Sequence, residues 1–134
     1  MNEQGSQILY PDYDEAVALH VRLMVSLQEH YYGVASEDLL ISALERPKMA
    51  AHFESADLIE QAAHILWGII RNHPFRQGNK RTGVAIAFAF LRENGLLIVA
   101  EQDDVISLGL GVAEGSTEVS EVTLWLRSHS VPRQ

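Results

Sequence analysis

The most constraining feature of this 134-residue sequence is the contrast between two neighbouring stretches, residues 73–81 and 84–91. The first is polar and basic and contains one proline and one glycine, which is typical of a loop. The second is eight consecutive apolar residues, and Asn94-Gly95 follows as a helix stop signal. We therefore predict a loop that leads into a helix from about Asn79 to Asn94. Because this helix is apolar on every side, we expect it to be the most buried one.

The predicted helix begins with two cations, Lys80 and Arg81, where the helix dipole is already positive. Each cation costs about 0.3–1 kcal/mol in that position, and a bound anion would remove the conflict. No Asp or Glu lies between residues 71 and 92, although the whole chain has a formal charge of -8. Five of the ten basic residues fall in this interval: Arg71, Arg76, Lys80, Arg81 and Arg92. This distribution favours focused binding of an anionic group such as a phosphate or carboxylate.

The residues of the loop suggest a division of chemical roles. His73 is the candidate general base, since a neutral imidazole can accept a proton near neutral pH. Gly78 allows the backbone to approach a phosphate closely, and Asn79 can donate to a phosphate oxygen or offer oxygen to a metal ion. Lys80 and Arg81 can hold phosphate charge. Each residue alone could be structural or simply exposed, and only their combination favours an anion site.

The remaining sequence excludes several classes of protein. Its length predicts one domain over residues 1–134, with residues 1–9 and 130–134 as loose tails. The absence of cysteine excludes disulfides, thiolate zinc sites and cysteine nucleophiles. No secretory signal pattern is found, and no apolar run approaches the ~20 residues that span a bilayer, so we expect a cytoplasmic protein without membrane contact. The charge of -8 argues against direct nucleic-acid binding.

Hydrophobic periodicity predicts an all-α fold of about six helices with minimal β structure. The predicted helices cover Asp14 to about Gln28, Ser36 to Leu44, Ser55 to about Arg71, Asn79 to Asn94, Asp103 to Val112, and Thr117 to Leu126. Pro47 is expected to stop the second helix, and Leu96–Ala100 is expected to be a short strand. We interpret His20 and His30 as half-exposed and His64 as exposed. Trp67 and Trp125 are more consistent with core positions than with ligand contacts.

Residues 73–82, His-Pro-Phe-Arg-Gln-Gly-Asn-Lys-Arg-Thr, resemble the signature of the Fic/Doc superfamily. That signature is His-x-Phe-x-acid-Gly/Ala-Asn, followed by Gly-x-Arg in Fic enzymes and by Lys-Arg in Doc (death on curing) toxins. Lys80-Arg81 is therefore similar to the Doc branch. Three later segments are also similar to that family: Phe90–Gly95, Leu108–Gly115 and Trp125–Arg127. The resemblance covers roughly Tyr10 to His129.

The resemblance implies a Fic/Doc-like helical domain around a buried central helix, and a toxin of a toxin-antitoxin system. Doc toxins transfer the γ-phosphate of ATP to a threonine of elongation factor Tu and thereby inhibit translation. The implied site has His73 as catalytic base and ATP as substrate, with Mg²⁺ as cofactor. The implied nucleotide-binding residues are Arg71, Gly78, Asn79, Lys80 and Arg81, and the candidate metal ligands are Asn79 and Gln77. The implied partners are a protein similar to elongation factor Tu and a cognate antitoxin.

Gln77 departs from the family pattern, which has Asp or Glu at this place. A neutral amide is a weaker ligand for a hard dication than a carboxylate is. Two alternatives therefore stay open beside the kinase: a Fic-type AMP transferase, or a catalytically degenerate fold that acts as a binding or regulatory module. Lys80 favours the kinase, because AMP-transferring relatives have a second glycine there. The same relatives can form a small flap near the substrate, for which Ala51–Phe53 is the candidate strand.

Overall fold

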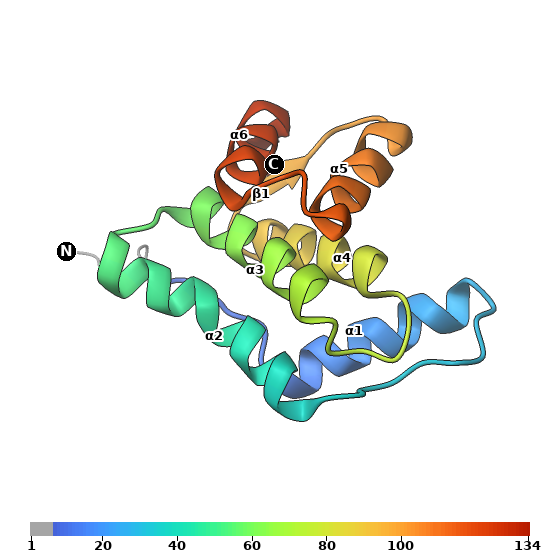
Figure 1. The fold of residues 1–134 in the computed structure, drawn as a ribbon. Coiled ribbons are helices and arrows are strands. Elements are labelled where there is room, and N and C mark those ends of the chain that lie inside the picture. Colours follow the sequence, from blue (N-terminus) through green and yellow to red (C-terminus); the bar gives the residue numbers. More distant parts are fainter. Residues whose placement is uncertain (1–6) are drawn as a thin grey trace.

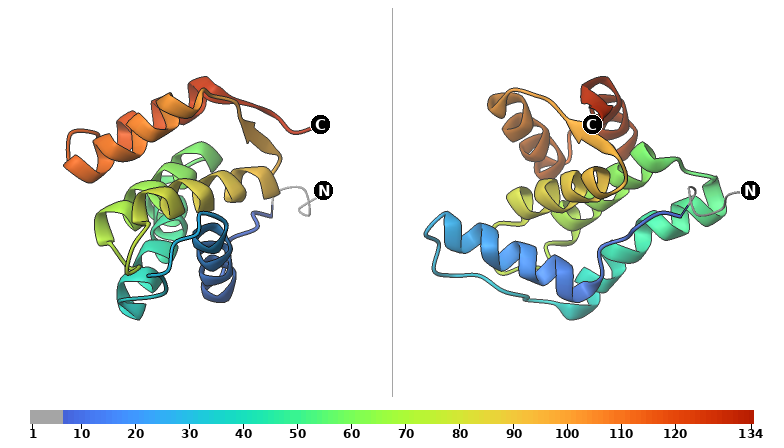
Figure 2. Two further views of the ribbon diagram at one scale, coloured as in Figure 1. Left: turned by 90° about the vertical axis from the view of Figure 1, so that its right-hand side faces the viewer. Right: turned by 180° about the vertical axis from the view of Figure 1, so that it is seen from behind.

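This computed structural model describes residues 7–134, which contain six helices and two short strands joined by loops. The predicted all-α fold with minimal β structure is therefore confirmed. The elements are α1 (Tyr13–Ser26), α2 (Glu37–Glu54), α3 (Leu58–Asn72), α4 (Asn79–Glu93), β1 (Leu96–Ile98), α5 (Gln102–Glu114), α6 (Val119–His129) and β2 (Ser130–Pro132). Figure 1 shows α3 and α4 in the middle of the molecule, and the side view of Figure 2 shows α5 and α6 above them and α1 and α2 below.

The most buried helix is α3, so the prediction that residues 84–91 lie in the most buried helix is wrong. Nine of the 15 residues of α3 are buried, compared with seven of the 15 in α4. Helices α2, α4, α5 and α6 all pack on α3, whereas part of the apolar run of α4 is only half-buried. An apolar run shows that a helix is covered but not how many neighbours cover it.

Side-chain caps determine where the first three helices begin. Asp12 caps α1, and Ser36 caps α2. The next helix was predicted to begin at Ser55, but Asp57 caps α3 through a capping box with Glu60, and Ser55 ends α2 in a left-handed conformation with φ of 56°. The sequence contains two possible capping residues two positions apart, Ser55 and Asp57. The residue that caps the helix is Asp57, which is followed three positions later by Glu60.

Helix α2 continues through Pro47 to Glu54, which contradicts both the predicted stop at Pro47 and the predicted flap strand at Ala51–Phe53. Proline in a helix interior removes one backbone hydrogen bond and usually costs about 3 kcal/mol. Here the Pro47 ring is buried on the face of α2 that packs against α3, together with Ala43 and Ala50. Tertiary packing of this face offsets the local cost.

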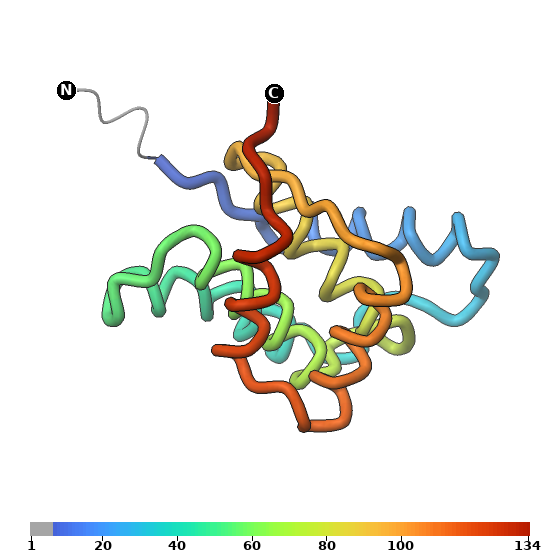
Figure 3. The backbone as a smooth tube through the Cα atoms, turned by 90° about the horizontal axis from the view of Figure 1, so that it is seen from above, coloured from blue at the N-terminus to red at the C-terminus, as the bar shows by residue number. Residues whose placement is uncertain are grey.

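The C-terminal end of the chain is paired with the strand that follows α4. In the antiparallel sheet Leu96 pairs with Pro132 and Ile98 with Ser130, which confirms a short strand after residue 95. The view in Figure 3 shows this last segment lying across the chain that follows α4. The prediction of a loose tail over 130–134 is therefore wrong for 130–132. The predicted N-terminal tail, 1–9, lies mostly outside the described residues.

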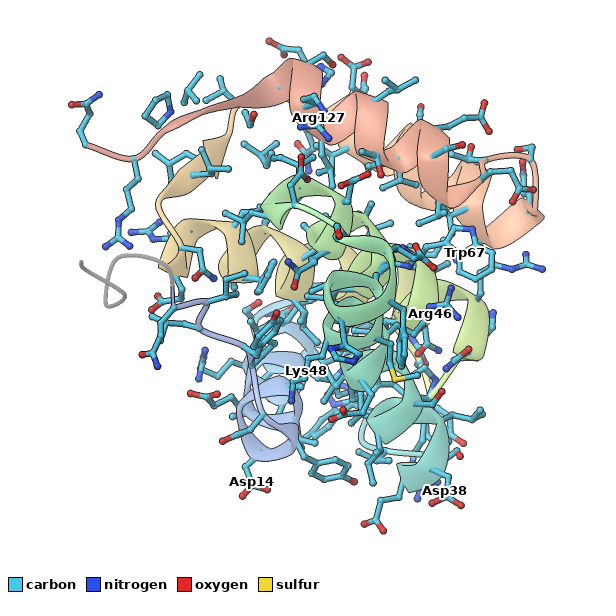
Figure 4. All side chains as sticks on the ribbon, turned by 90° about the vertical axis from the view of Figure 1, so that its left-hand side faces the viewer. Asp14, Asp38, Arg46, Lys48, Trp67 and Arg127 are labelled. Atoms are coloured by element: carbon cyan, nitrogen blue, oxygen red, sulfur yellow. The ribbon has the colours of Figure 1, made fainter. Side chains whose placement is uncertain are left out.

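Two features of the surface complete the fold. Figure 4 shows Asp14 and Asp38 at the same end of the molecule, where their charges complement the first turns of α1 and α2. The same view shows Trp67 beside Arg46, whose guanidinium lies 4.9 Å from the ring centroid. Trp67 and Trp125 pack against the core, as the sequence predicted.

Among residues 7–134, none of the helices has the length and apolar character to span a membrane.

Candidate active site

The loop between α3 and α4 begins with His73 in an unusual backbone conformation. His73 is the C-cap of α3, and its φ of 52° places it in the left-handed region. A residue other than glycine pays about 1 kcal/mol or more for this conformation, and such positions cluster at functional sites. Its backbone N–H donates to the Ile69 carbonyl at 3.1 Å, and its imidazole is exposed. The strained backbone thus ends the helix and leaves the predicted base open to solvent.

Asn79 holds the shape of this loop from inside. Its buried side chain accepts from the Phe75 N–H through Oδ1 at 2.9 Å and donates to the Phe75 carbonyl through Nδ2 at 2.9 Å. This pair of bonds fixes the orientation of the amide, so Nδ2 also faces Nδ1 of His73 at 3.4 Å. The predicted phosphate or metal contact of Asn79 stays a prediction, because the structure shows a bracing role.

A second segment, residues 33–36, pairs with the loop from the other side. The Pro74 carbonyl accepts from the N–H groups of Ala35 at 2.8 Å and Ser36 at 3.0 Å. The Arg76 N–H donates to the Gly33 carbonyl at 2.9 Å, and an antiparallel bridge joins residues 34 and 75. Figure 1 shows this segment passing beneath the loop on its way from α1 to α2. The loop is therefore bonded to a stretch of chain about 40 residues earlier, which the sequence did not indicate.

His20 supports the loop from below, and the prediction that it is half-exposed is wrong. It is fully buried, and its ring stacks on Phe75 with a centroid distance of 4.0 Å. The Gly33 N–H donates to Nε2 at 3.0 Å, so the proton of the neutral ring is on Nδ1, which donates to Thr82 Oγ1 at 2.9 Å. The spacing of His20 from two other buried residues, Ala16 and Met24, was the signal that could have revealed this burial.

Burial lowers the pKa of His20, and this predicts a loss of stability in mild acid. As the pH falls below about 6.5, the unfolded chain takes up a proton at this site before the folded chain does. The stabilisation is therefore complete above that pH and is lost below it, by at most about 1.4 kcal/mol per pH unit for one group. Urea unfolding at pH 7 and pH 5 should show a smaller difference for His20→Gln than for the unsubstituted protein.

His64 provides the control for that experiment, and the prediction that it is exposed is also wrong. It is half-buried, and its pKa is lowered by burial and, to a smaller degree, by the charge of Arg46. His64→Gln should remove a separate part of the pH dependence, far from the loop. If the free energy of unfolding had the same pH dependence in the unsubstituted protein and in His20→Gln, the assignment of a neutral His20 ring in the folded protein would be contradicted. His30 is exposed rather than half-exposed.

The start of α4 has backbone N–H groups that no side chain caps. Its N-cap is Gly78, which has a φ of 78° and no side chain to cap the first backbone N–H groups, in contrast to the caps of α1, α2 and α3. A Cβ at Gly78 would come within 2.5 Å of the Met24 sulfur, so only glycine fits. Lys80 and Arg81 are exposed beside these groups. Uncapped N–H groups, the helix dipole and two cations together favour a phosphate.

Arg71 lies at the end of another helix. Its Nη1 donates to the carbonyls of Val112 at 3.2 Å and Ala113 at 3.3 Å, and its guanidinium lies 5.9 Å from the Trp67 ring centroid. These carbonyls belong to the last turn of α5, where helices lack internal donors. The structure thus shows Arg71 joining α3 to α5, and its predicted phosphate contact stays a prediction.

Gln77 is exposed and contacts an acidic residue that the sequence did not single out. Its Nε2 donates to Oε1 of Glu29 at 2.9 Å, and the other carboxylate oxygen of Glu29 lies 3.9 Å from Nη1 of Arg81. Glu29 follows α1, directly after Gln28, whose φ is 62°. No sequence pattern links positions 29 and 77, so only the tertiary fold could reveal the pair. Within residues 7–134, no group of three or more His, Cys, Asp or Glu side chains could hold a metal alone.

The chain is similar to known proteins over about half of its length or more. The model of the Fic/DOC family matches residues 10–91, more than half of the chain. The protein kinase doc of Escherichia phage P1 is 38% identical over 77 residues, which are 58% of this chain and 60% of that protein. The toxin Doc of Mycolicibacterium smegmatis is 39% identical over 67 residues, 48% of this chain and 52% of that protein. The matches thus span between half and two thirds of the length of these relatives.

Proposed function

This chain belongs to the Fic/DOC family, and on that premise we propose that it is a Doc-like toxin that phosphorylates a translation factor. The substrate would be a protein similar to elongation factor Tu, and the phosphate would come from the γ position of ATP. The observation that carries the proposal is the exposed His73 beside the uncapped start of α4, where Lys80 and Arg81 are also exposed. The candidate base and the candidate phosphate site thus lie at the two ends of one short loop.

The proposed reaction needs little covalent chemistry from the protein. The oxygen of the target hydroxyl forms a bond to the γ-phosphorus, the bond between that phosphorus and the β–γ bridging oxygen breaks, and ADP leaves. His73 accepts the proton of the hydroxyl, while Lys80 and Arg81 neutralise charge on the phosphoryl oxygens. The uncapped N–H groups of α4 hold a phosphate group in place. Catalysis then depends mainly on position and charge, as expected for phosphoryl transfer.

The family also implies Mg²⁺, and the side chains at the site include oxygen donors suited to it. Mg²⁺ bound with a nucleotide commonly uses one or two carboxylates together with phosphate oxygens and water. Glu29 offers one carboxylate, and Gln77 offers an amide oxygen within the same contact. When bound, the ion would neutralise charge on the phosphates of ATP.

Two alternatives to the kinase are an AMP transferase and a degenerate fold that only binds partners. Lys80 argues against AMP transfer, because a bulky cation stands where a Fic-type phosphate nest has its second glycine. The bracing of the loop by Asn79 and the glycine-only position at Gly78 argue against degeneration, because both keep a strained backbone in place. The kinase therefore agrees best with the residues present.

The position of the transferred label separates these possibilities. The protein is incubated with elongation factor Tu and Mg²⁺, and with ATP labelled in either the α or the γ phosphate. We expect γ label on the target and no α label. The opposite result would identify an AMP transferase, and no transfer of either label under conditions where the protein binds ATP would support the binding module.

A groove beside α1 and α4 is our candidate for the antitoxin. It has a volume of about 620 Å³ and is lined mainly by apolar residues of 8–11, α1 and α4, including Leu9, Leu19 and Phe90. Because α1 also supports the loop through His20 and Met24, a segment bound along this helix would extend toward the site. An apolar groove of this kind suits an amphipathic segment that orders on binding.

A further inference from the structure

The contact between Glu29 and Gln77 has a geometry that fits a shared cation. We propose that Glu29 supplies the carboxylate charge that position 77 lacks, so that the two side chains together form the protein's part of a magnesium site. This proposal rests on the proposed nucleotide-dependent function, because phosphate oxygens must complete the coordination. It differs from the family pattern, in which the charge is carried within the loop itself.

The distance between the two side chains is the first support. Nε2 of Gln77 and Oε1 of Glu29 are 2.9 Å apart. Rotating the terminal amide of Gln77 by half a turn exchanges its nitrogen and oxygen, which leaves two oxygen atoms at about the same separation. Neighbouring ligands of an octahedral Mg²⁺, each 2.0–2.1 Å from the ion, lie roughly 3 Å apart. The pair can therefore become two adjacent ligands without movement of the backbone.

The same contact accounts for the orientation of the Gln77 amide. Two oxygen atoms at this distance would repel one another, so the nitrogen of Gln77 faces the carboxylate and donates to it. A cation between the side chains reverses this preference, because it attracts both oxygens. Gln77 can donate a hydrogen bond to Glu29 when no cation lies between them, and it can offer its oxygen beside Glu29 when a cation does. An Asp or Glu at position 77 would instead face a like charge whenever no cation is bound.

Arg81 connects this pair to the uncapped start of α4, where the phosphate is proposed to bind. Its guanidinium lies 3.9 Å from the second carboxylate oxygen of Glu29, and both side chains are partly exposed. An exposed pair at this distance is weak and can separate at little cost. When a nucleotide is bound, Arg81 can turn to the phosphate, and the carboxylate is then free for a cation on the same phosphate. The arrangement keeps Glu29 close to the loop in both states.

Binding of Mn²⁺ tests the proposal without any measurement of catalysis. Mn²⁺ is titrated into the protein with a non-hydrolysable ATP analogue, and free Mn²⁺ is followed by electron paramagnetic resonance. Glu29→Gln should weaken Mn²⁺ binding at least about tenfold, in line with losses seen when a metal site is altered. Glu93→Gln, which removes the same charge from an exposed residue at the far end of α4, should leave the affinity unchanged.

Restoring the charge at position 77 makes the test specific. Adding Gln77→Glu to Glu29→Gln moves the carboxylate to the other side of the pair, and it should return Mn²⁺ affinity to within about threefold of the unsubstituted protein. Thermal melts confirm that each variant is folded. Unchanged Mn²⁺ affinity in Glu29→Gln, or no recovery in the double variant, would overturn the proposal.

A titration of the analogue in the presence of EDTA distinguishes failure of this proposal from failure of the proposed function. If Glu29→Gln tightens nucleotide binding without metal and leaves Mn²⁺ affinity unchanged, Glu29 competes with phosphate for Arg81 and is not a ligand. If neither the unsubstituted protein nor any variant binds nucleotide, the proposed function itself is wrong, and the metal site is rejected with it. Tight nucleotide binding with a Glu29-dependent Mn²⁺ affinity supports both.

Discussion

His73→Ala should lower transfer of γ label to the target protein by at least about 10²-fold. Positioned general bases contribute roughly 10²–10⁴-fold to a rate, and His73 is the exposed imidazole of the loop that leads into the uncapped start of α4. The nucleotide should still bind, because its proposed contacts come from α4. The measurement is the initial rate of labelling at saturating ATP, together with the affinity for ATP.

The backbone conformation of His73 requires a second variant. A positive φ has a higher free-energy cost for alanine than for asparagine. His73→Ala could therefore perturb the loop as well as remove the base. His73→Asn tolerates the left-handed backbone, but it cannot accept a proton near neutral pH. Both variants should lose labelling to the same degree while His73→Asn keeps its melting temperature. More than a tenth of the original rate in His73→Asn would exclude His73 as the base.

Arg81→Ala should have the second large effect, a loss of about 10²–10³-fold in the rate of labelling. Removing one group that stabilises charge in a transition state typically costs this much. Arg81→Lys keeps the charge but not the planar, bidentate geometry, and it should recover only part of the rate. The measurement is the maximal rate with each variant at saturating ATP and Mg²⁺.

Arg92→Ala is the matched control for this variant. Arg92 is an exposed arginine in the last turn of α4, at the opposite end from the loop, where its charge complements the helix dipole. Its substitution should leave the rate within about twofold. Equal losses in Arg81→Ala and Arg92→Ala would show that the basic charge acts at long range and that Arg81 makes no specific contact.

The sequence suggested the part of the candidate site that is contiguous in the chain. Residues 73–82 contain the candidate base, the bracing amide, the glycine and the cations in one short stretch, so a linear motif was sufficient to propose them. His20, Glu29 and segment 33–36 reach the same place only through the packing of α1 beside α4. Each of them makes a polar contact across at least 38 residues. Patterns of local periodicity carry no information about such contacts.

The fold was predictable where local and tertiary preferences agree. The apolar stripe of α3 and the loop before α4 were identified correctly because short-range signals and burial favour the same structure. Pro47 is the opposite case, since its local preference ends a helix while its burial against α3 extends one. Capping residues were ambiguous for a similar reason, because Ser55 and Asp57 both have suitable side chains and only the geometry of the connection selects one.

The bracing of the loop has a consequence for the thermodynamics of ligand binding. Hydrogen bonds within the protein join Pro74, Phe75 and Arg76 to Asn79 and to residues 33–36. The loop is therefore ordered as the protein folds. Ordering one residue costs about 1–2 kcal/mol of conformational entropy, and a nucleotide that meets an ordered loop does not bear this cost. Hydrogen exchange of the amides of Ala35, Ser36, Phe75 and Arg76 should therefore be slow before ATP is added and change little afterwards. Association should fit a single step, with no slow phase in which the loop rearranges.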